Sequence, residues 1–140
     1  MKKMKLICYL FITITMYSSC NEHEQELSGT KWKLDGVVTV NGNTQILESK
    51  SDLCYSLKFN ESNELSGFSS ANQLHGTYEI VSTNKIHIDI HAITEINELF
   101  DGRLYINFLN DVQSYSFKRN CLCLYFESGK KYLLFIPVKG

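Results

Sequence analysis

The most distinctive chemistry in this 140-residue sequence lies in histidine and carboxylate side chains at alternate positions of one predicted strand. His87, Asp89 and His91 alternate with isoleucines, so the three polar side chains share one face of a strand over residues 86–91. In the pairing that we expect, Glu79 of the preceding strand lies opposite Asp89. Imidazole and carboxylate groups within reach of one another can bind zinc, and histidines can also form a pH-sensitive cluster. The more ordinary interpretation is the solvated face of an exposed strand.

Cys20 is the second chemically distinctive residue, because it ends a segment with the layout of an export signal. Lysines at positions 2, 3 and 5 precede an apolar run over residues 6–16, and two serines precede the cysteine. The run is about eleven residues long, short of the roughly twenty that a membrane-spanning helix needs. The segment resembles a bacterial lipoprotein signal, in which the cysteine is lipidated and becomes the new N-terminus. Tyr17 stands where an aliphatic residue is usual, and a plain cleaved signal peptide is the alternative.

This resemblance predicts a signal peptide over residues 1–19, a lipidated cysteine with an acidic tether over 20–27, and a domain over 28–140. It implies a lipid anchor in the outer membrane, with periplasmic and surface-exposed positions both open. Removing the three lysines changes the formal net charge from −1 to −4 (−1 minus 3). Such an acidic domain lacks the basic stripe that is typical of nucleic-acid binding. We expect a monomer whose partners are the membrane and an envelope protein.

Three cysteines remain in the predicted domain: Cys54, Cys121 and Cys123. An exported protein can form disulfides, and a bond between Cys54 and either of the others stays open. The favoured interpretation is that they are small buried hydrophobic residues. The Cys-x-Cys spacing is not that of structural zinc modules, and we predict no cofactor.

Alternating apolar residues and turn signals predict eight or nine short antiparallel strands. Trp32 and Leu34 mark the first strand, which Asp35-Gly36 is expected to end, and Asn41-Gly42-Asn43 predicts a hairpin. Strand-like stretches around this hairpin and after it lie over residues 37–40, 44–47, 54–59, 64–68, 76–82, 86–91, 113–118, 121–127 and 131–136.

The hairpin after Tyr78 could turn in two ways. A two-residue turn at Thr83-Asn84 would place Ile80 beside His87 and mix apolar with polar residues on one face. A three-residue loop over residues 83–85 instead pairs Ile80 with Ile88. We predict this longer loop, because a slip of one residue inverts the faces of a strand.

One helix is predicted, because Tyr105, Phe108, Leu109 and Val112 recur at helical spacing. It should run from Gly102 to Asp111 with Asp101 as its N-cap. The last two strands are apolar on both faces, so we expect the helix to cover one of them. Because large sheets curl and closure removes their edges, the predicted fold is mainly β. It is a small antiparallel, partly closed β-barrel with a lipocalin-like curl and one helix inserted before the last three strands.

Two motifs connect the sequence to a known family. Residues 30–34 form a Thr-Trp-x-Leu-like start, and Gly67, Asn72, Gly76 and Tyr78 fit a pattern of Gly, Cys-Asn and Gly-x-Tyr. The sequence thereby resembles the META domain family of small bacterial envelope and secreted proteins over most of residues 30–136. Ala71 replaces the usual cysteine. The resemblance implies no enzymatic reaction and supplies no catalytic residues.

The motif residues Asn72, Gly76 and Tyr78 could form a ligand-contacting loop. The favoured interpretation is structural, since Asn and Gly tolerate left-handed backbone and Tyr78 suits a core with its hydroxyl at the rim. No catalytic set is recognisable, so we expect a non-enzymatic, lipid-anchored protein with a binding or envelope-stress role. The alternatives are a small β-barrel protease inhibitor or ligand carrier, and a zinc-dependent protein. A barrel interior filled by aromatic side chains would argue against a carrier.

Overall fold

The computed structural model describes residues 26–94 and 96–139, so the predicted signal peptide and Cys20 lie outside the described residues. Within these ranges the chain forms nine strands, the α-helix α1 (Gly102–Asp111) and two short 3-10 helices, η1 (Glu61–Asn63) and η2 (Glu127–Gly129). The helices of these ranges include none with the length and apolar character to span a bilayer. The strands are β1 (Lys31–Thr39), β2 (Thr44–Gln45), β3 (Ser56–Phe59), β4 (Glu64–Phe68), β5 (Gln73–Ser82), β6 (Lys85–Ala92), β7 (Ser114–Lys118), β8 (Cys121–Phe126) and β9 (Lys131–Pro137).

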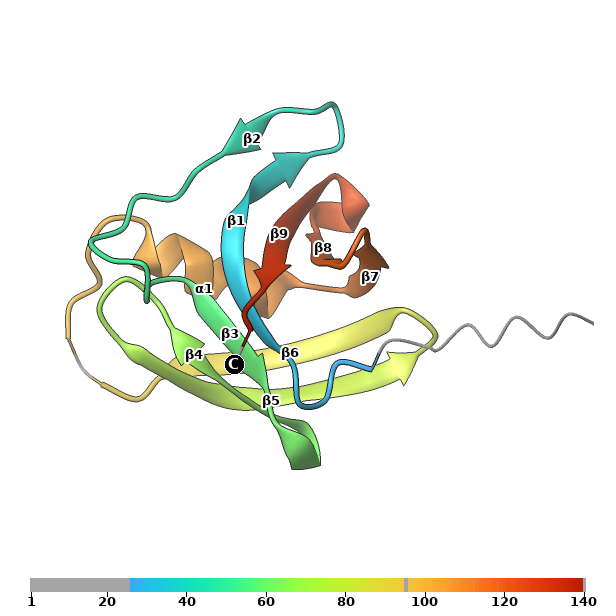
Figure 1. Cartoon of the computed structure of the whole chain (residues 1–140), viewed down its shortest axis with the longest axis horizontal. Coiled ribbons are helices and arrows are strands. Elements are labelled where there is room, and N and C mark those ends of the chain that lie inside the picture. Colours follow the sequence, from blue (N-terminus) through green and yellow to red (C-terminus); the bar gives the residue numbers. More distant parts are fainter. Residues whose placement is uncertain (1–25, 95, 140) are drawn as a thin grey trace, which may run out of the picture.

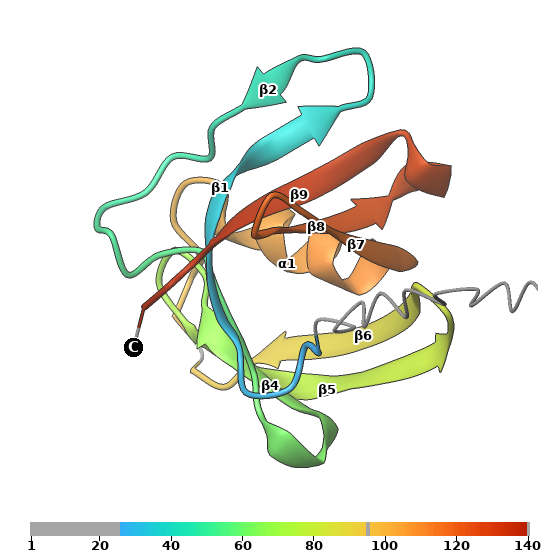
Figure 2. The same ribbon diagram turned by 45° about the vertical axis from the view of Figure 1, so that its right-hand side comes forward.

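The strands form one antiparallel sheet that closes almost completely into a ring. Its order is β2-β1-β3-β4-β5-β6-β7-β8-β9, and pairing between β1 and β9 joins the two ends. Strands β3 to β6 lie on one side of the molecule and β7 to β9 on the other, with α1 between them (Figures 1 and 2). The predicted mainly β, partly closed barrel with one helix before the last three strands is confirmed.

The ring is weakest between β6 and β7, which share a single residue pair, Lys85 with Ser114. Beyond that pair, α1 lies where a neighbouring strand would otherwise be. The Asn110 side chain of α1 accepts a hydrogen bond from the Ile90 amide (2.8 Å) and donates one to the Ile90 carbonyl (3.0 Å). A strand edge without a neighbour leaves such backbone groups unpaired, so Asn110 supplies the partners that Ile90 of β6 would otherwise lack.

Side chains fill the interior of the barrel. Trp32, Tyr55, Phe59 and Tyr78 are all buried, with exposed fractions of 5% or less. The rings of Phe59 and Tyr78 pack edge to face with 5.0 Å between their centroids. Aromatic residues thus occupy the space that a ligand carrier would need for its cargo.

The helix contributes to the same core. Tyr105 and Leu109 are completely buried, and Phe108 stacks on Phe126 of β8 with 4.6 Å between ring centroids. Tyr105 also lies 6.5 Å from the ring of Phe135 in β9. These contacts confirm that α1 covers one face of the last two strands.

Two strand predictions were wrong, and both errors involve β-bulges. Asp35-Gly36 does not end the first strand: β1 continues through it, with Asp35 as an extra residue opposite β9. The β5–β6 hairpin uses the two-residue turn, and Val81 forms a bulge that pairs Ile80 with Ile86. The bulge compensates for the inversion of faces that a tight turn would otherwise cause, so the apolar residues still face the core.

Candidate functional site

The four residues proposed as a zinc site lie on the outer face of β5 and β6. Because of the bulge, Glu79 lies opposite His87, and Asp89 lies opposite Thr77 instead of Glu79. Across residues 26–94 and 96–139, no group of three or more His, Cys, Asp or Glu side chains is arranged to hold a metal ion. The predicted solvent exposure of His87, Asp89 and His91 agrees with the structure.

Asn72, Gly76 and Tyr78 have structural roles in the described part of the chain. Neither Asn72 nor Gly76 has a positive φ, so the left-handed backbone that we expected is wrong for both. Gly76 is required because a Cβ there would overlap the carbonyl oxygen of Asp89 on β6. Tyr78 is a core aromatic, 5% exposed, as expected.

The structural role of Asn72 lies in its side-chain amide, which joins two loops through hydrogen bonds. The amide oxygen accepts hydrogen bonds from the Thr94 hydroxyl (2.6 Å) and the Ile96 amide (3.1 Å). The amide nitrogen donates to the Ile96 carbonyl (2.7 Å) and to the carboxylate of Glu98 (2.6 Å). A single buried side chain thereby fixes the segment that leads from β6 to α1.

Glu98 is the centre of this arrangement, which we call the Glu98 network: Ser69, Ser70, Asn72 and Glu98. Ser69 and Ser70 donate their hydroxyl protons to the Glu98 carboxylate at 2.6 and 2.7 Å. Partial burial raises the pKa of Glu98. Hydrogen bonds from the two serines, Asn72 and the Ala71 backbone together lower it by more than burial raises it, so the pKa lies below the ordinary value of 4.5. The group is therefore a carboxylate at neutral pH.

The described cysteines are free thiols. Cys54 and Cys123 are buried and Cys121 is partly exposed, in agreement with the favoured interpretation as small hydrophobic residues. Burial raises the pKa of the Cys123 thiol, although Lys118 nearby acts in the opposite direction. A raised pKa keeps this thiol protonated and unreactive at neutral pH.

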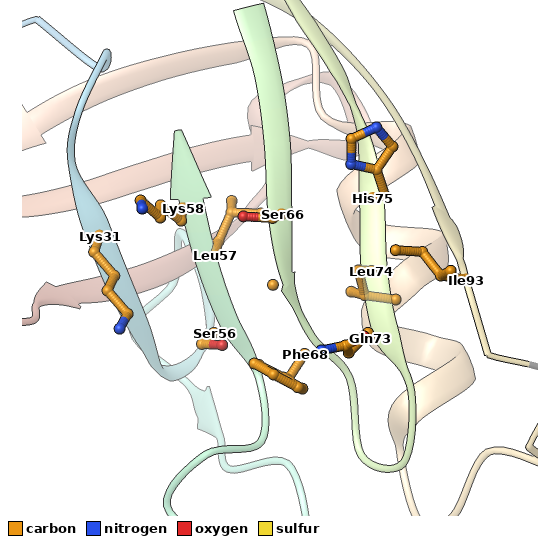
Figure 3. A pocket seen from close by; sticks show the side chains of 11 residues that line it. Lys31, Ser56, Leu57, Lys58, Ser66, Phe68, Gln73, Leu74, His75 and Ile93 are labelled. Carbon is orange, nitrogen blue, oxygen red and sulfur yellow. The ribbon is translucent and has the colours of Figure 1, made fainter. Parts of the chain in front are cut away.

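A shallow groove of about 280 Å³ crosses the outer face of β1, β3, β4 and β5. Lys31, Lys58 and His75 lie along it, and Phe68 and Ile93 supply apolar surface (Figure 3). In the stretches that the structure describes, no Asp or Glu lines the groove. It therefore combines positive charge with exposed apolar side chains, in a chain whose formal net charge is −1.

The lysines and histidines belong to one line of directly paired residues, which we call the basic row. Strand register pairs each member with the next across five strands: Lys31, Lys58, Ser66, His75 and His91. The His75 and His91 rings lie 6.3 Å apart. Neighbouring strands are about 4.8 Å apart, so the row spans about 19 Å.

Comparison with known proteins shows the family to which this sequence belongs. A model of the META domain family matches residues 25–138. The chain belongs to the META domain family. A protein of Tannerella forsythia named "Putative lipoprotein" is 26% identical over 141 residues, which cover 95% of this chain and 96% of that protein. The sequence-based resemblance to the META domain family is thereby confirmed.

Two solved structures share the fold of this META domain at low sequence identity. A Burkholderia xenovorans protein solved by NMR superposes with a TM-score of 0.64 at 19% identity, covering 81% of this chain and 85% of that one. A DUF4847 family protein from Bacteroides vulgatus also has a TM-score of 0.64, at 15% identity, covering 80% of this chain and 94% of that one. At such identities the likeness concerns the fold alone.

Sequence reasoning missed Glu98 and the basic row. Glu98 stands between irregular segments with no periodic pattern, so nothing near it in the sequence indicated its buried partners. Strand alternation did indicate that Lys31, Lys58 and His75 point outward. Only the register of five strands reveals that they are aligned.

Proposed function

We propose that this META domain protein is anchored by acyl chains on Cys20 in the bacterial outer membrane and acts there by binding, without an enzymatic reaction. The observation that carries the proposal is the position of Cys20, four residues after the end of the apolar run and five residues before the family match begins. The name of the Tannerella forsythia relative, which aligns with 95% of the chain, supports it.

The anchor limits where the domain can act. Each acyl methylene that enters the membrane contributes about 0.8 kcal/mol, so two or three chains on Cys20 hold the protein permanently. The tether from Cys20 to the buried Leu27 reaches about 25 Å when fully extended. Binding partners must therefore approach within a few nanometres of the membrane.

Metabolic labelling with a palmitate analogue tests the anchor directly. Wild-type protein should incorporate label and fractionate with the outer membrane, whereas Cys20→Ala should do neither. Cys8→Ala, which removes another cysteine from the same N-terminal segment, is the matched control and should be labelled normally. Equal labelling of wild type and Cys20→Ala would refute the proposal.

The way the described residues use their polar groups supports binding over catalysis. The Glu98 carboxylate accepts hydrogen bonds from Ser69, Ser70 and Asn72, so the fold engages its oxygen atoms instead of leaving them free to meet a substrate. The filled barrel interior likewise favours binding on the outer surface over carriage of a ligand inside.

Protease inhibition is a second candidate, favoured by the loop before α1. Ile96 and Phe100 are 58% and 54% exposed, while the Glu98 network between them holds the loop in one shape. A rigid loop with exposed apolar side chains suits a protease cleft, because little conformational entropy is lost on binding. Wild-type protein should then slow envelope proteases of the same cell, and Phe100→Ser should not; no inhibition by wild type would exclude this function.

A further inference from the structure

The lysines of the basic row destabilise the sheet when no ligand is bound. Lys31 lies directly opposite Lys58. Like charges at directly opposite positions of an antiparallel pair are destabilising. A sheet whose outer face served only for solubility would be expected to alternate charges of opposite sign.

Neither lysine of the row is neutralised by a residue that the structure describes. The ion pair found in those ranges joins Lys131 and Glu127, on another part of the barrel. Lys33, two positions from Lys31, offers a contrast: its ammonium donates to the Cys54 carbonyl and lies over the Tyr55 ring. The ammonium groups of Lys31 and Lys58 are thus available to a ligand.

Charge and polarity change in one direction across the row. On β4, the outward-facing residues run from Glu64 through Ser66 to Phe68. On β6 and just beyond it, the order is Asp89, His91 and Ile93. Carboxylates of β4 and β6 therefore border the row on one side, and on the other side Phe68 and Ile93 lie beside the uncharged Ser56 and Gln73.

This gradient fixes the kind of ligand that fits. An anionic group placed on the row meets two ammonium groups and the Ser66 hydroxyl. A ligand that extends from there toward Glu64 and Asp89 would be repelled, whereas an apolar part directed toward Phe68 and Ile93 would cover surface that is 41% and 57% exposed. Figure 3 shows Phe68 and Ile93 on the side of the groove that such a part would reach.

We infer that the groove binds a small amphipathic anion, with a phosphate or carboxylate group on the basic row and an apolar part on Phe68 and Ile93. Lysine acts as a compact point charge toward phosphate, and a groove of about 280 Å³ suits a ligand of about one ring plus its charged group. The inference rests on the proposal that the protein acts by binding, but it is independent of the anchor on Cys20.

Calorimetric titration of the full-length protein in neutral detergent tests this, with phenyl phosphate as the probe. Inorganic phosphate and phenol supply the two halves of the probe separately. Phenyl phosphate should bind about tenfold more tightly than inorganic phosphate, because the ring covers apolar surface, and phenol alone should not bind measurably. Equal affinity for phenyl phosphate and inorganic phosphate would overturn the inference.

Charge-reversal variants locate the site. Lys58→Glu should weaken phenyl phosphate binding about thirtyfold, because one attraction becomes one repulsion. Lys85→Glu makes the same charge change on the outer face of β6, about 20 Å along the strand from His91, and should alter affinity less than about twofold. Equal losses in the two variants would mean that only the overall charge matters, and would refute the site.

The folding of Lys58→Glu provides an independent check. The substitution replaces a pair of like charges by an opposite pair with Lys31, so its melting temperature should equal or exceed that of wild type. If Lys58→Glu nevertheless fails to fold, Phe68→Ser replaces it: that variant should bind phenyl phosphate only as tightly as inorganic phosphate. Unchanged affinity in Phe68→Ser would overturn the placement of the apolar part.

Two sources could supply such an anion, and nanodiscs separate them. If phospholipid headgroups are the source, phosphatidylglycerol in the nanodisc should compete with phenyl phosphate, whereas pure phosphatidylcholine should not. If the source is a free small molecule, neither lipid competes. Failure of palmitate labelling at Cys20 would refute the anchor without affecting these titrations, so the two proposals fail separately.

Discussion

The Glu98 network should contribute measurably to stability at neutral pH, and Glu98→Gln isolates that contribution. The carboxylate accepts three hydrogen bonds of 2.6–2.7 Å from Ser69, Ser70 and Asn72, all of which are buried. Glutamine keeps the shape of the side chain but replaces one acceptor oxygen by an NH₂ group that must find an acceptor. The variant therefore loses the charge and at least one of the three bonds.

The magnitude follows from the partial exposure of Glu98. A hydrogen bond to a fully buried charged group contributes about 1.5–3 kcal/mol, but solvent screens a half-buried carboxylate. We therefore expect a loss of about 1 kcal/mol for Glu98→Gln and about 2 kcal/mol for Glu98→Ala, which leaves three donors unpaired. For a domain of this size, 1 kcal/mol corresponds to roughly 4 °C in melting temperature.

The pH dependence gives the prediction a definite sign. Because the folded-state pKa of Glu98 is lowered, its contribution is fully present above the unfolded-state pKa of about 4.5 and is lost as the pH falls through the folded-state value. Urea unfolding followed by Trp32 fluorescence should thus separate wild type from Glu98→Gln at pH 7. The difference should shrink as the pH falls below the unfolded-state pKa and vanish once the pH lies below the folded-state pKa.

Hydrogen exchange supplies a local measurement and the refuting result. The amides of Ile96 and Leu99 donate to Asn72 and to the Ser70 hydroxyl, so they should lose protection in Glu98→Gln. Glu61→Gln, which alters an exposed carboxylate in η1, is the control and should change neither stability nor exchange. Equal effects of the two substitutions at pH 7, or a difference in stability that does not shrink as the pH falls below the unfolded-state pKa, would contradict the role assigned to Glu98.

Two further substitutions and one deletion test how the barrel is held together. Gly76→Ala should cost about 3 kcal/mol in urea unfolding, because its Cβ would overlap the Asp89 carbonyl and push β5 from β6. Asn110→Ala should cost about 2 kcal/mol, and exchange of the Ile90 amide should accelerate, since both backbone groups of Ile90 lose their partner. Deletion of Val81 should change stability by less than about 1 kcal/mol, because the 63% exposed bulge residue can be removed without altering the pairing on either side.

Patterns confined to one element were predicted well from the sequence. Helical spacing from Tyr105 to Val112 placed α1 at its observed bounds, with Asp101 preceding it. The side chain of Asp101 does not cap the helix, however: it accepts a hydrogen bond from the Glu48 amide (2.9 Å) in the loop before β3. Local periodicity thus located the helix, whereas the partner of its first polar side chain lies 53 residues away.

The candidate site could not be predicted in the same way, because it depends on register. With the predicted pairing of Ile80 and Ile88, His75 would have lain opposite Ile93, and His91 opposite Thr77. The two-residue turn and the extra residue at Val81 each shift β6 by one position relative to that pairing, and together they bring His75 and His91 side by side.

The two registers of β5 and β6 differ in which residues they place opposite one another. Both registers keep isoleucines on the core face, so hydrophobic burial alone does not distinguish them. The observed register also sets Gly76 against Ile90, where the missing side chain lets β5 and β6 approach closely. In the predicted register Gly76 would instead lie opposite Ala92, and Tyr78 would lie opposite Ile90. The close approach at Gly76, a residue of the family motif, and the alignment of His75 with His91 in the basic row therefore belong to one and the same register of β5 and β6.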